Sequence, residues 1–535
     1  MIKVRGIFGG CARVGLIFGL ALLCGLAAAN DAMAKSLVGY GWEFLGTTTE
    51  DVHRNRAKFA ETGLDGVILP VDGKRADGAL VRGRYMMTTN RFADADFAAT
   101  VPLLREVTAS PGLTESYALT MLIPSKRVAW DDDAAWEAFA HNMSVVVRTA
   151  KAGGLRGIAI DHEDYNKARQ FNQYPTDPSG TWELARKRGR QVFGGVFAEM
   201  PEAKVLGFWM FSDSGVLWKA FLNGMLDVLP PTAKFIDGNE NYGYEANAAM
   251  DEFRRDVWFQ TRQLRGSVVP ENRAKYDTGL SVGFGMYLDS YVNKENPSYY
   301  FPPLNGSRVA RLEDNFAGAM RYADDLVWVY GEKGTFIDWD RKDNPKLQRP
   351  TWESRLPGLR RALRIAAGDG SAIDAEVASG ALTNLIANAG CDPVPGKAVP
   401  VYGWSRLSEP APDGVFGYAA DEGHAKPGAL KLSGDGCFCL GGGGLVSGEF
   451  VYVRAWVKGG AGVIGFDWQS GMKRHRYLDR GGFTPTGPTE NGWREIFAHL
   501  RVPKGMDRLN INLSGRASPE APLLFDDVGI FVKAR

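Results

Sequence analysis

The sequence predicts an α/β chain in which a (β/α)8 TIM barrel is followed by a C-terminal antiparallel β-sandwich of jelly-roll type. Between about residues 37 and 368, short apolar runs alternate eight times with amphipathic stretches, the pattern of parallel strands joined by helices. Beyond about residue 370 the chain turns to Gly, Pro and short alternating runs, which indicate a sandwich. A doubly wound open sheet is the alternative to the barrel, but no GxGxxG or GxxxxGK[ST] motif follows an early strand.

The elements of the barrel are expected in regular order. Eight strands are predicted near 37–44, 66–71, 117–123, 156–161, 204–211, 233–238, 280–289 and 326–331. Eight helices are predicted near 50–62, 94–106, 131–152, 180–199, 215–228, 245–265, 308–324 and 352–367. Eight such units of this total length are typical of a closed parallel barrel.

Alternate residues of a strand share one face, so the strand sequences predict which side chains point inward. Apolar residues of three strands are expected to pack against the helices: Ile158, Ile160, Val282, Phe284, Met286, Leu288, Val327 and Val329. The residues between them are expected to point inward: Gly157, Ala159, Asp161, Glu163, Ser281, Gly283, Gly285, Tyr287, Asp289, Trp328, Tyr330 and Glu332. These strands therefore bring acids to the carboxyl end of the barrel, where barrel enzymes have their active sites.

The ends of the chain indicate export and a second domain. Residues 1–34 have the basic start, apolar run and Ala32-Met33-Ala34 ending of a secretory signal, so the mature chain is expected to begin near Lys35 and to be periplasmic or secreted. The barrel is expected over 35–368, a linker over 369–383 and a carbohydrate-binding-module-like β-sandwich over 384–535.

Charge and cysteine content exclude several classes of partner. Residues 35–535 carry 60 basic and 61 acidic side chains, and this balance argues against a nucleic-acid partner. No further segment approaches the roughly 20 apolar residues that span a bilayer, so no membrane contact is expected after signal removal. A disulfide from Cys391 to Cys437 or Cys439 is possible, and no paired CxxC metal spacing is present.

The strongest chemical signal follows the fourth strand, where an apolar run ends in Asp161, Glu163 and Asp164. Asp161 and Glu163 lie two apart, so a strand directs both to one side, where one carboxyl tends to hold a proton that the other gives up. A protonated carboxyl is what a glycosidase needs as its general acid. The structural alternative is a helix cap, or a pair with Arg156 or Lys167, which explains one acid and not two.

The segment Gly157-Ile-Ala-Ile-Asp-His-Glu163 resembles the fourth-strand motif of chitinase-like glycoside hydrolases, in which alternating Asp residues end in a catalytic Glu. Asp161 and Glu163 match the last Asp and the Glu of that motif, whereas Arg156 and Ala159 depart from it. More broadly, an acid after strand four is similar to many retaining barrel glycosidases. The resemblance implies a barrel glycosidase with Glu163 as its acid or acid/base.

Other strand ends supply candidates for the second carboxylate and for substrate contacts. Glu332 is favoured by its parity, then Glu240, then Asp289. The candidate substrate-binding residues are Trp209, Asp237, Asn239, Tyr287, Asp289, Trp328 and Tyr330. Trp328 offers a face on which a sugar ring can stack, although Trp and Tyr in a barrel are more often core residues. The loop aromatics of Tyr299–Pro303 and Gln173–Tyr174 fit a saccharide site or local packing, and His162 is expected to point outward into the core.

The C-terminal part resembles the jelly-roll carbohydrate-binding modules found behind glycosidase barrels. The segments that show the similarity are Asn384–Asn388, Val451–Val457, Gly492–Arg494 and Phe525–Val528. The resemblance implies that the sandwich can hold a structural calcium, with Asp526 or Asp527 as a ligand. The alternative is a domain that only packs against the barrel.

These observations predict an exported glycoside hydrolase that cleaves a poly- or oligosaccharide and requires no cofactor. Glu163 is its expected acid, Asp161 modulates the proton of Glu163, and Glu332 or Glu240 acts as nucleophile or base. The alternatives are a non-catalytic polysaccharide-binding protein and a polysaccharide lyase, whose cationic patch the near-neutral charge does not favour. No HExxH or GxSxG motif supports a metalloprotease or an esterase.

Overall fold

The computed structural model describes most of the chain from Lys35 onward. The described residues are 35–163, 169–171, 178–213, 215–295, 298–341, 343–393, 405–406, 415–471, 473–475, 482–485 and 489–535. Several sequence predictions lie outside the described residues, namely the leader 1–34, Asp164, Lys167, Gln173 and Tyr174.

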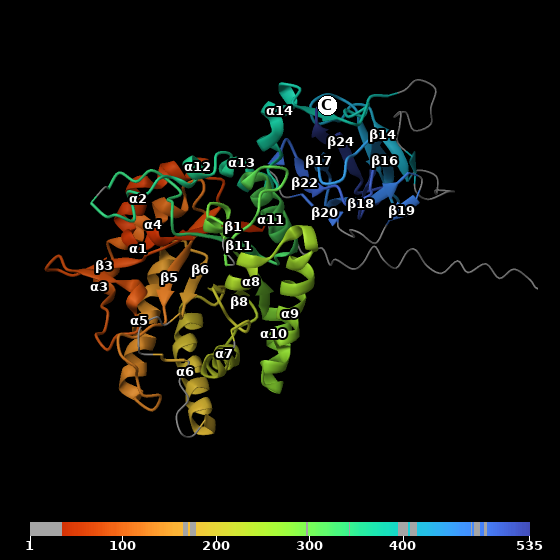
Figure 1. Ribbon diagram of the computed structural model, residues 1–535. Helices are drawn as coiled ribbons and strands as arrows, with labels where there is room; N and C mark the ends of the chain where they lie inside the picture. The colour runs from red at the N-terminus through yellow and green to blue at the C-terminus, as the bar shows by residue number, and fades with distance from the viewer. Residues whose placement is uncertain are drawn as a thin grey trace, which may run out of the picture. The chain divides into compact units, whose positions relative to one another are not determined.

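A parallel sheet that is nearly closed on itself forms the first part of the fold, as the sequence predicts (Figure 1). Within the described ranges, its nine strands lie in the order β10-β11-β1-β2-β5-β6-β7-β8-β9. They are β1 (Ser36–Gly41), β2 (Gly66–Leu69), β5 (Tyr117–Met121), β6 (Gly157–Asp161), β7 (Lys204–Gly207), β8 (Lys234–Asp237), β9 (Leu280–Val282), β10 (Phe284–Tyr287) and β11 (Leu326–Gly331).

The two ends of this sheet belong to one stretch of chain. Strand β9 pairs with β8, strand β10 pairs with β11, and only Gly283 separates β9 from β10. A Cβ at Gly283 would lie 3.0 Å from both Ile236 and the carbonyl oxygen of Leu326, so the two neighbouring strands approach too closely for a side chain here. The predicted single strand 280–289 is therefore one kinked strand that links the first and last neighbours of the sheet.

Helices follow the strands along the chain and cover the sheet (Figure 1). The α-helices are α1 (Trp42–Gly46), α2 (Thr49–Asn55), α3 (Asp94–Phe97), α4 (Thr100–Thr108), α5 (Asp133–Ala152), α6 (Pro178–Glu199), α7 (Val216–Asp227), α8 (Glu240–Glu245), α9 (Phe259–Gln263), α10 (Arg273–Gly279), α11 (Arg308–Tyr322), α12 (Trp352–Arg355) and α13 (Leu359–Ala366). The 3-10 helices are η2 (Arg56–Glu61), η3 (Gly83–Tyr85), η4 (Ala248–Met250), η6 (Leu264–Ser267), η7 (Pro270–Asn272) and η8 (Leu288–Tyr291), and η5 (Phe253–Trp258) is a π-helix. A separate pair of short strands consists of β3 (Asp72–Lys74) and β4 (Leu80–Arg82).

The apolar residues predicted to face the helices are buried. Ile158, Val282 and Val329 have no exposed surface, and the ring of Phe284 packs edge-on against Phe253 of η5, 5.2 Å between centroids. Burial of apolar surface in this layer is the main stabilising contribution to such a sheet. The pattern of alternation therefore located the helix-facing side of these strands.

Several elements end earlier than the sequence predicts or are split in two, among them the first strand and the helix expected over 245–265. The first strand stops at Gly41, and the residues from Trp42 form α1 instead of continuing the strand to 44. The helix expected over 245–265 is broken into η4, η5 and α9, because Asp251 adopts a left-handed conformation with φ 58°.

The C-terminal region consists of antiparallel sheets, as expected for a sandwich. One sheet contains β14 (Phe416–Ala419), β15 (Ala429–Leu432), β24 (Leu523–Lys533), β17 (Phe450–Lys458), β22 (Trp493–Arg501), β21 (Thr489–Glu490) and β12 (Leu382–Asn384). The other contains β13 (Ser405–Arg406), β16 (Phe438–Gly443), β23 (Arg508–Gly515), β18 (Gly462–Ser470), β19 (Lys473–His475) and β20 (Gly482–Phe483). Apolar residues of both sheets, including Val453 and Ile511, form one buried core.

The stretch 369–383, expected as a linker, contains η9 (Gly370–Ile373) and α14 (Asp374–Ala378) and reaches the start of β12. No disulfide joins Cys391, Cys437 and Cys439, and the sulfur atoms of Cys437 and Cys439 lie 3.4 Å apart. The possible bridge from Cys391 is therefore not formed. Within the described ranges, no helix is both long enough and apolar enough to cross a bilayer.

Candidate functional site

The acids predicted after the fourth strand lie at the end of β6. Asp161 is the last residue of β6, and its Oδ1 accepts a 2.9 Å hydrogen bond from the backbone N–H of Glu163. Burial, and then the charge of Glu163, raise the pKa of Asp161 to about 6, although this hydrogen bond acts in the opposite direction. Arg156 pairs instead with Glu115 at 2.7 Å, so it does not account for either acid as an ion-pair partner.

Glu240 joins these two acids from the end of β8, where it opens α8. Burial is the main cause that raises its pKa to about 8, and the charges of Glu163 and Asp161 add to the rise. Hydrogen bonding from Tyr244 and Trp209 offsets part of this rise. A carboxyl group with such a pKa holds its proton at neutral pH.

Glu332 belongs to a second pair of acids. Its backbone N–H donates a 2.8 Å hydrogen bond to Oδ2 of Asp289, and its side chain accepts a 3.2 Å hydrogen bond from the hydroxyl of Tyr330. Burial raises the pKa of both Asp289 and Glu332. Asp289 has no exposed surface, so of the two acids Glu332 is the one that reaches solvent.

Four tyrosines surround these carboxyl groups. The rings of Tyr244 and Tyr330 lie nearly parallel at 6.0 Å, and Tyr287 stacks against both, at 4.9 Å from Tyr244 and 5.5 Å from Tyr330. Tyr40, which pairs in register with Tyr330, stacks on it at 5.6 Å. We call Asp161, Glu163, Glu240 and these four tyrosines the tyrosine–carboxyl cluster.

Burial raises the pKa of every tyrosine in this cluster. The charge of Asp161 adds to the rise at Tyr40, and the charge of Glu240 adds to it at Tyr244. Glu332 and Glu240 both act on Tyr330, which places this ring between the two groups of acids. The phenols therefore stay protonated at neutral pH and serve as hydrogen-bond donors.

Trp328 lies beneath the tyrosine rings rather than among solvent-exposed groups. It has no exposed surface, stacks on Phe208 at 4.4 Å, and donates a 2.9 Å hydrogen bond from Nε1 to the carbonyl oxygen of Gly238. A Cβ at Gly285 would lie 2.9 Å from its ring, so the glycines of neighbouring strands make room for the indole. Trp328 is therefore a core residue, and the rings of Tyr244 and Tyr330 pack against it.

Asp237 and Asn239 are also fully buried, and neither occupies the substrate-contacting position that the sequence suggests. The carboxylate of Asp237 accepts hydrogen bonds from the backbone N–H groups of Met210 and Ser212 and from the Ser212 hydroxyl. Asp237 therefore fixes the loop after β7 that contains Trp209. Asn239, with φ 44°, turns the chain from β8 into α8 and so directs Glu240.

Trp209 and Tyr242 supply aromatic surface beside Glu240. Trp209 is half-buried, and its ring meets that of Tyr242 edge-on at 5.8 Å. Tyr242 is 53% exposed, so its ring is open to solvent. Tyr299 lies on the other side of Tyr244, edge-on at 6.1 Å.

His162 points away from the cluster, into the core. It stacks on Trp218 at 3.9 Å, and its Nε2 lies 2.8 Å from Oδ2 of Asp213. This is the helix-contacting position that its parity predicts.

Sequence reasoning missed Tyr40, Tyr242 and Tyr244 as members of the site. Tyr40 carried a usable signal, because it is an aromatic residue at the carboxyl end of the first strand. Tyr244 follows Glu240 by four residues, a spacing at which two side chains of a helix meet. That signal requires α8 to begin at Glu240, and the sequence placed the helix later.

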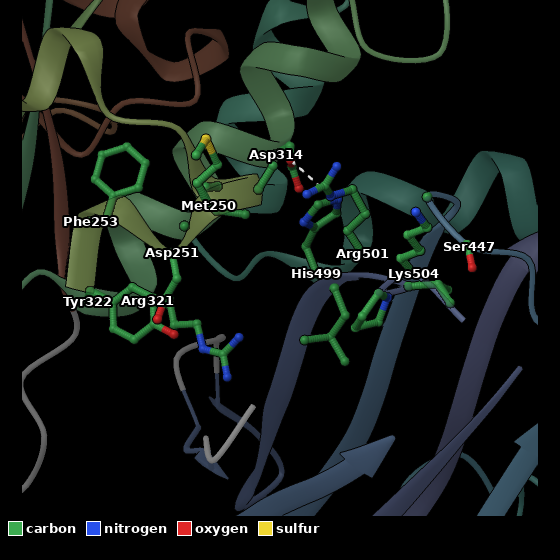
Figure 2. A pocket seen from close by; sticks show the side chains of 18 residues that line it. Met250, Asp251, Phe253, Asp314, Arg321, Tyr322, Ser447, His499, Arg501 and Lys504 are labelled. Atoms are coloured by element: carbon green, nitrogen blue, oxygen red, sulfur yellow. Dashed lines mark ion pairs between the residues drawn. The ribbon is translucent and has the colours of Figure 1, made fainter. Parts of the chain in front are cut away.

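Figure 2 shows a separate cavity of about 650 Å³, which none of the cluster acids lines. Its lining includes Asp251 and Asp314 from the barrel and His499, Arg501 and Lys504 from the sandwich, which belong to one compact unit with the barrel. Arg501 and Asp314 form an ion pair at 3.2 Å, drawn as a dashed line in Figure 2. Burial lowers the pKa of His499 to about 3, so this imidazole is uncharged at neutral pH.

The two residues expected as structural-calcium ligands are hydrogen-bonded within the protein. Asp526 accepts hydrogen bonds from the backbone N–H groups of His424 and Asp527, and Asp527 lies 2.7 Å from Nδ1 of His424. Among the described residues, no group of three or more His, Cys, Asp or Glu side chains gathers in a way that could hold a metal ion.

Comparisons with known proteins give no family. No protein-family model matches this chain, and no curated protein does. Among solved structures, D-psicose 3-epimerase in the presence of D-fructose is 11% identical, with a TM-score of 0.33, over 62% of this chain and 96% of the epimerase.

Two further structures match the chain over shorter stretches. The CBM22-1–GH10 modules of endo-1,4-beta-D-xylanase 10B from Clostridium thermocellum, complexed with xylohexaose, are 17% identical with a TM-score of 0.20, over 25% of this chain and 26% of the xylanase. TmCBM61 in complex with beta-1,4-galactotriose is 17% identical with a TM-score of 0.20, over 28% of this chain and 99% of the module. The chain thus spans about a quarter of the xylanase. All these TM-scores lie below 0.5, so the similarities carry no argument about function.

Proposed function

We propose that the protein is a glycoside hydrolase that cleaves a poly- or oligosaccharide at the tyrosine–carboxyl cluster. The observation that carries the proposal is the position of Glu240, whose pKa is raised to about 8 beside Glu163 and Asp161. A protonated carboxyl group next to an ionised one is the pair that hydrolysis of a glycosidic bond requires.

The roles follow from which group holds the proton. Glu240 is the general acid, because it remains protonated at neutral pH and can donate to the leaving-group oxygen. Glu163 is the nucleophile, or the base that activates water. Asp161 accepts the backbone N–H of Glu163 and adds negative charge that keeps the proton on Glu240. Sequence analysis predicted Glu163 as the acid and Glu332 or Glu240 as nucleophile or base. This proposal therefore exchanges the roles of Glu163 and Glu240.

The aromatic residues around the acids supply hydrogen-bond donors and a stacking surface for a sugar. Tyr244 and Tyr330 present protonated phenols beside the acids, and the exposed ring of Tyr242 with Trp209 offers a surface on which a sugar can stack. Glu332, half-buried beside Tyr330, is placed to accept hydrogen bonds from sugar hydroxyls.

A polysaccharide lyase is the second candidate, and one observation favours it. Lys346 and Arg349 lie over the ring of Trp42, near Glu332, and such cations can neutralise the acid group of a uronate. A lyase also needs a base that removes a proton from carbon. The raised pKa values of Tyr40, Tyr244 and Tyr330 do not provide such a base at neutral pH, so hydrolysis is the better-supported reaction.

The test is to incubate residues 35–535 with a panel of neutral and acidic polysaccharides. New reducing ends, with the anomer of the product read by NMR before mutarotation, would support hydrolysis and separate retention from inversion. An unsaturated product would identify a lyase instead. If wild-type protein binds a polysaccharide but leaves it intact, the chain is a non-catalytic binding protein and the hydrolase proposal is wrong.

We also propose that residues 1–34 direct export and are removed near Lys35, on the sequence pattern alone. Expression of the full sequence in a bacterial host, with fractionation and N-terminal sequencing, tests this. A cytoplasmic protein that retains Met1 would contradict it.

A further inference from the structure

Three loops that follow barrel strands meet beside the tyrosine–carboxyl cluster. Trp42 begins α1 directly after β1, Arg84 lies in η3 after β2, and Lys346 and Arg349 lie in the loop after β11. Because β1 and β11 pair up to Gly41 and Gly331, the residues that follow them, Trp42 and Glu332, emerge side by side at the same end of the sheet.

Two cations share one aromatic ring at this place. The Lys346 ammonium lies 5.5 Å and the Arg349 guanidinium 4.9 Å from the centroid of the Trp42 ring. The aromatic face attracts both cations, whereas the two like charges repel each other. Among the described residues, Lys346 forms no ion pair with an acid.

The loops are fixed in place before any ligand binds. Arg84 is 2% exposed and donates hydrogen bonds to the carbonyl oxygens of Phe44 and Leu45, which end α1. Asn344 donates to the carbonyl oxygen of Gly46 at 3.2 Å and accepts from the backbone N–H of Lys346 at 3.0 Å. These contacts hold Lys346 against Trp42 without using its ammonium group.

Among the nearby carboxyl groups, the buried Glu43 does not cancel this positive charge. The charge of Arg349 lowers the pKa of Glu43, Asp289 and Glu332. Burial has the larger effect and raises the pKa of each of these acids, that of Glu43 to about 8. At neutral pH Glu43 is therefore mainly uncharged. Burial and the charges of Arg84 and Arg349 lower the pKa of Lys346, as expected where cations outnumber their partners.

We propose that Trp42, Lys346 and Arg349, which we call the Trp42 site, bind an anionic substituent of the saccharide, a ring carboxylate or a sulfate ester. The site is continuous with the cluster, because Arg349 donates a hydrogen bond to the carbonyl oxygen of Glu332 and the side chain of Glu332 accepts from Tyr330. The inference rests on the proposed function for its ligand class. It predicts that the substrate is an acidic polysaccharide.

The experiment measures binding by the Glu240→Gln form of residues 35–535, so that no turnover is needed. The probes are polygalacturonate, its methyl ester, dextran sulfate and unmodified dextran, measured by isothermal titration calorimetry at low and high salt. Polygalacturonate and its methyl ester share one backbone and differ in whether the carboxyl group is charged or methylated. The two acidic probes distinguish a carboxylate from a sulfate.

The test variant is Lys346→Met, which keeps the stem against Trp42 and removes the charge. Lys346→Arg is the variant expected to retain binding, and Lys533→Met, at an exposed position on β24, is the matched control. We expect tighter binding of one acidic probe than of its neutral counterpart. We also expect an approximately tenfold loss of that binding in Lys346→Met, the effect of a hydrogen-bonded charge pair, with none in Lys533→Met.

Two results would overturn the inference. One is equal binding of the acidic and the neutral probes by the wild-type site. The other is binding of an acidic probe that Lys346→Met leaves unchanged, because that binding would be non-specific attraction to other cations. Cleavage of neutral polysaccharides with an unaffected Lys346→Met variant would leave the hydrolase proposal standing and refute this one alone.

Discussion

The phenolic hydroxyl of Tyr244 donates a 3.1 Å hydrogen bond to Oε1 of Glu240, one turn earlier in α8. The other oxygen of Glu240, Oε2, is buried and accepts no hydrogen bond from any described residue. A buried carboxyl oxygen without a donor is best tolerated when the group is protonated, which agrees with the raised pKa of Glu240. This relationship supports the assignment of Glu240 as the proton donor.

Replacement of Glu240 by Gln is expected to lower kcat by roughly 10²–10⁴-fold, the usual contribution of a general acid. Thermal unfolding should be unchanged or shifted upward, because the substitution removes a half-buried carboxyl whose ionisation is costly. Activity on the polysaccharide identified by the panel, together with calorimetry, checks both. Wild-type turnover in this variant would mean that a residue other than Glu240 is the general acid.

Removal of the negative charge at Asp161 is expected to move the alkaline limb of the pH–rate profile to lower pH. Above about pH 6 Asp161 is ionised and helps to keep the proton on Glu240, so Asp161→Asn lowers the pKa of Glu240. The profile of kcat against pH measures the shift. Asp435→Asn, at an exposed position in the sandwich, should leave the profile unchanged.

Tyr244→Phe should shift that alkaline limb in the opposite direction. The hydroxyl of Tyr244 lowers the pKa of Glu240, so its removal raises that pKa and extends activity to higher pH. The same pH–rate measurement tests it. A shift to lower pH in both variants would mean that Glu240 is not the group that titrates.

Asp237→Asn is expected to destabilise the protein by about 1–3 kcal/mol, because an amide cannot accept all the hydrogen bonds from Met210 and Ser212 that the carboxylate accepts. Denaturant unfolding measures the loss. Ser212→Ala, which removes one of these donors and leaves the carboxylate, should cost less. A fully stable Asp237→Asn variant would show that this buried acid does not hold the loop of Trp209.

Glu43→Gln is expected to flatten the dependence of stability on pH. The carboxyl of Glu43 is buried, accepts hydrogen bonds from Phe336 and Trp339, and has its pKa raised to about 8. The folded state therefore holds a proton that the unfolded state loses above about pH 4.5. Stability from this group falls as pH rises from about 4.5 to 8. Unfolding free energies of wild type and Glu43→Gln between pH 5 and 9 would show the difference, and parallel curves would contradict it.

Trp209→Ala and Tyr242→Ala are expected to raise KM by several-fold with a smaller change in kcat, because stacking on a sugar ring contributes roughly 0.5–1.5 kcal/mol. Phe259→Ala, which removes a ring that is 54% exposed on α9, is the matched control. Steady-state kinetics on an oligosaccharide measure KM and kcat for both variants and for the control. A KM equal to that of wild type in both variants would remove these rings from the site.

The sequence by itself determined the parallel barrel, the sandwich, and the arrival of Asp161 and Glu163 at the carboxyl end of one strand. These features depend on periodicity within single strands and helices, which is local information. For the same reason parity placed Ile158 and Val329 in the core and His162 away from the acids.

Only the tertiary structure decided which carboxyl group faces Glu163. Strand parity favoured Glu332, but β11 lies on the far side of β1 from β6, and Glu332 gathers with Asp289 instead. Glu240 reaches Glu163 because Asn239 turns the chain out of β8 in a left-handed conformation, where strand parity no longer applies. The raised pKa of Glu240 likewise arises from burial and from charges on another strand, and no single segment of sequence contains that information.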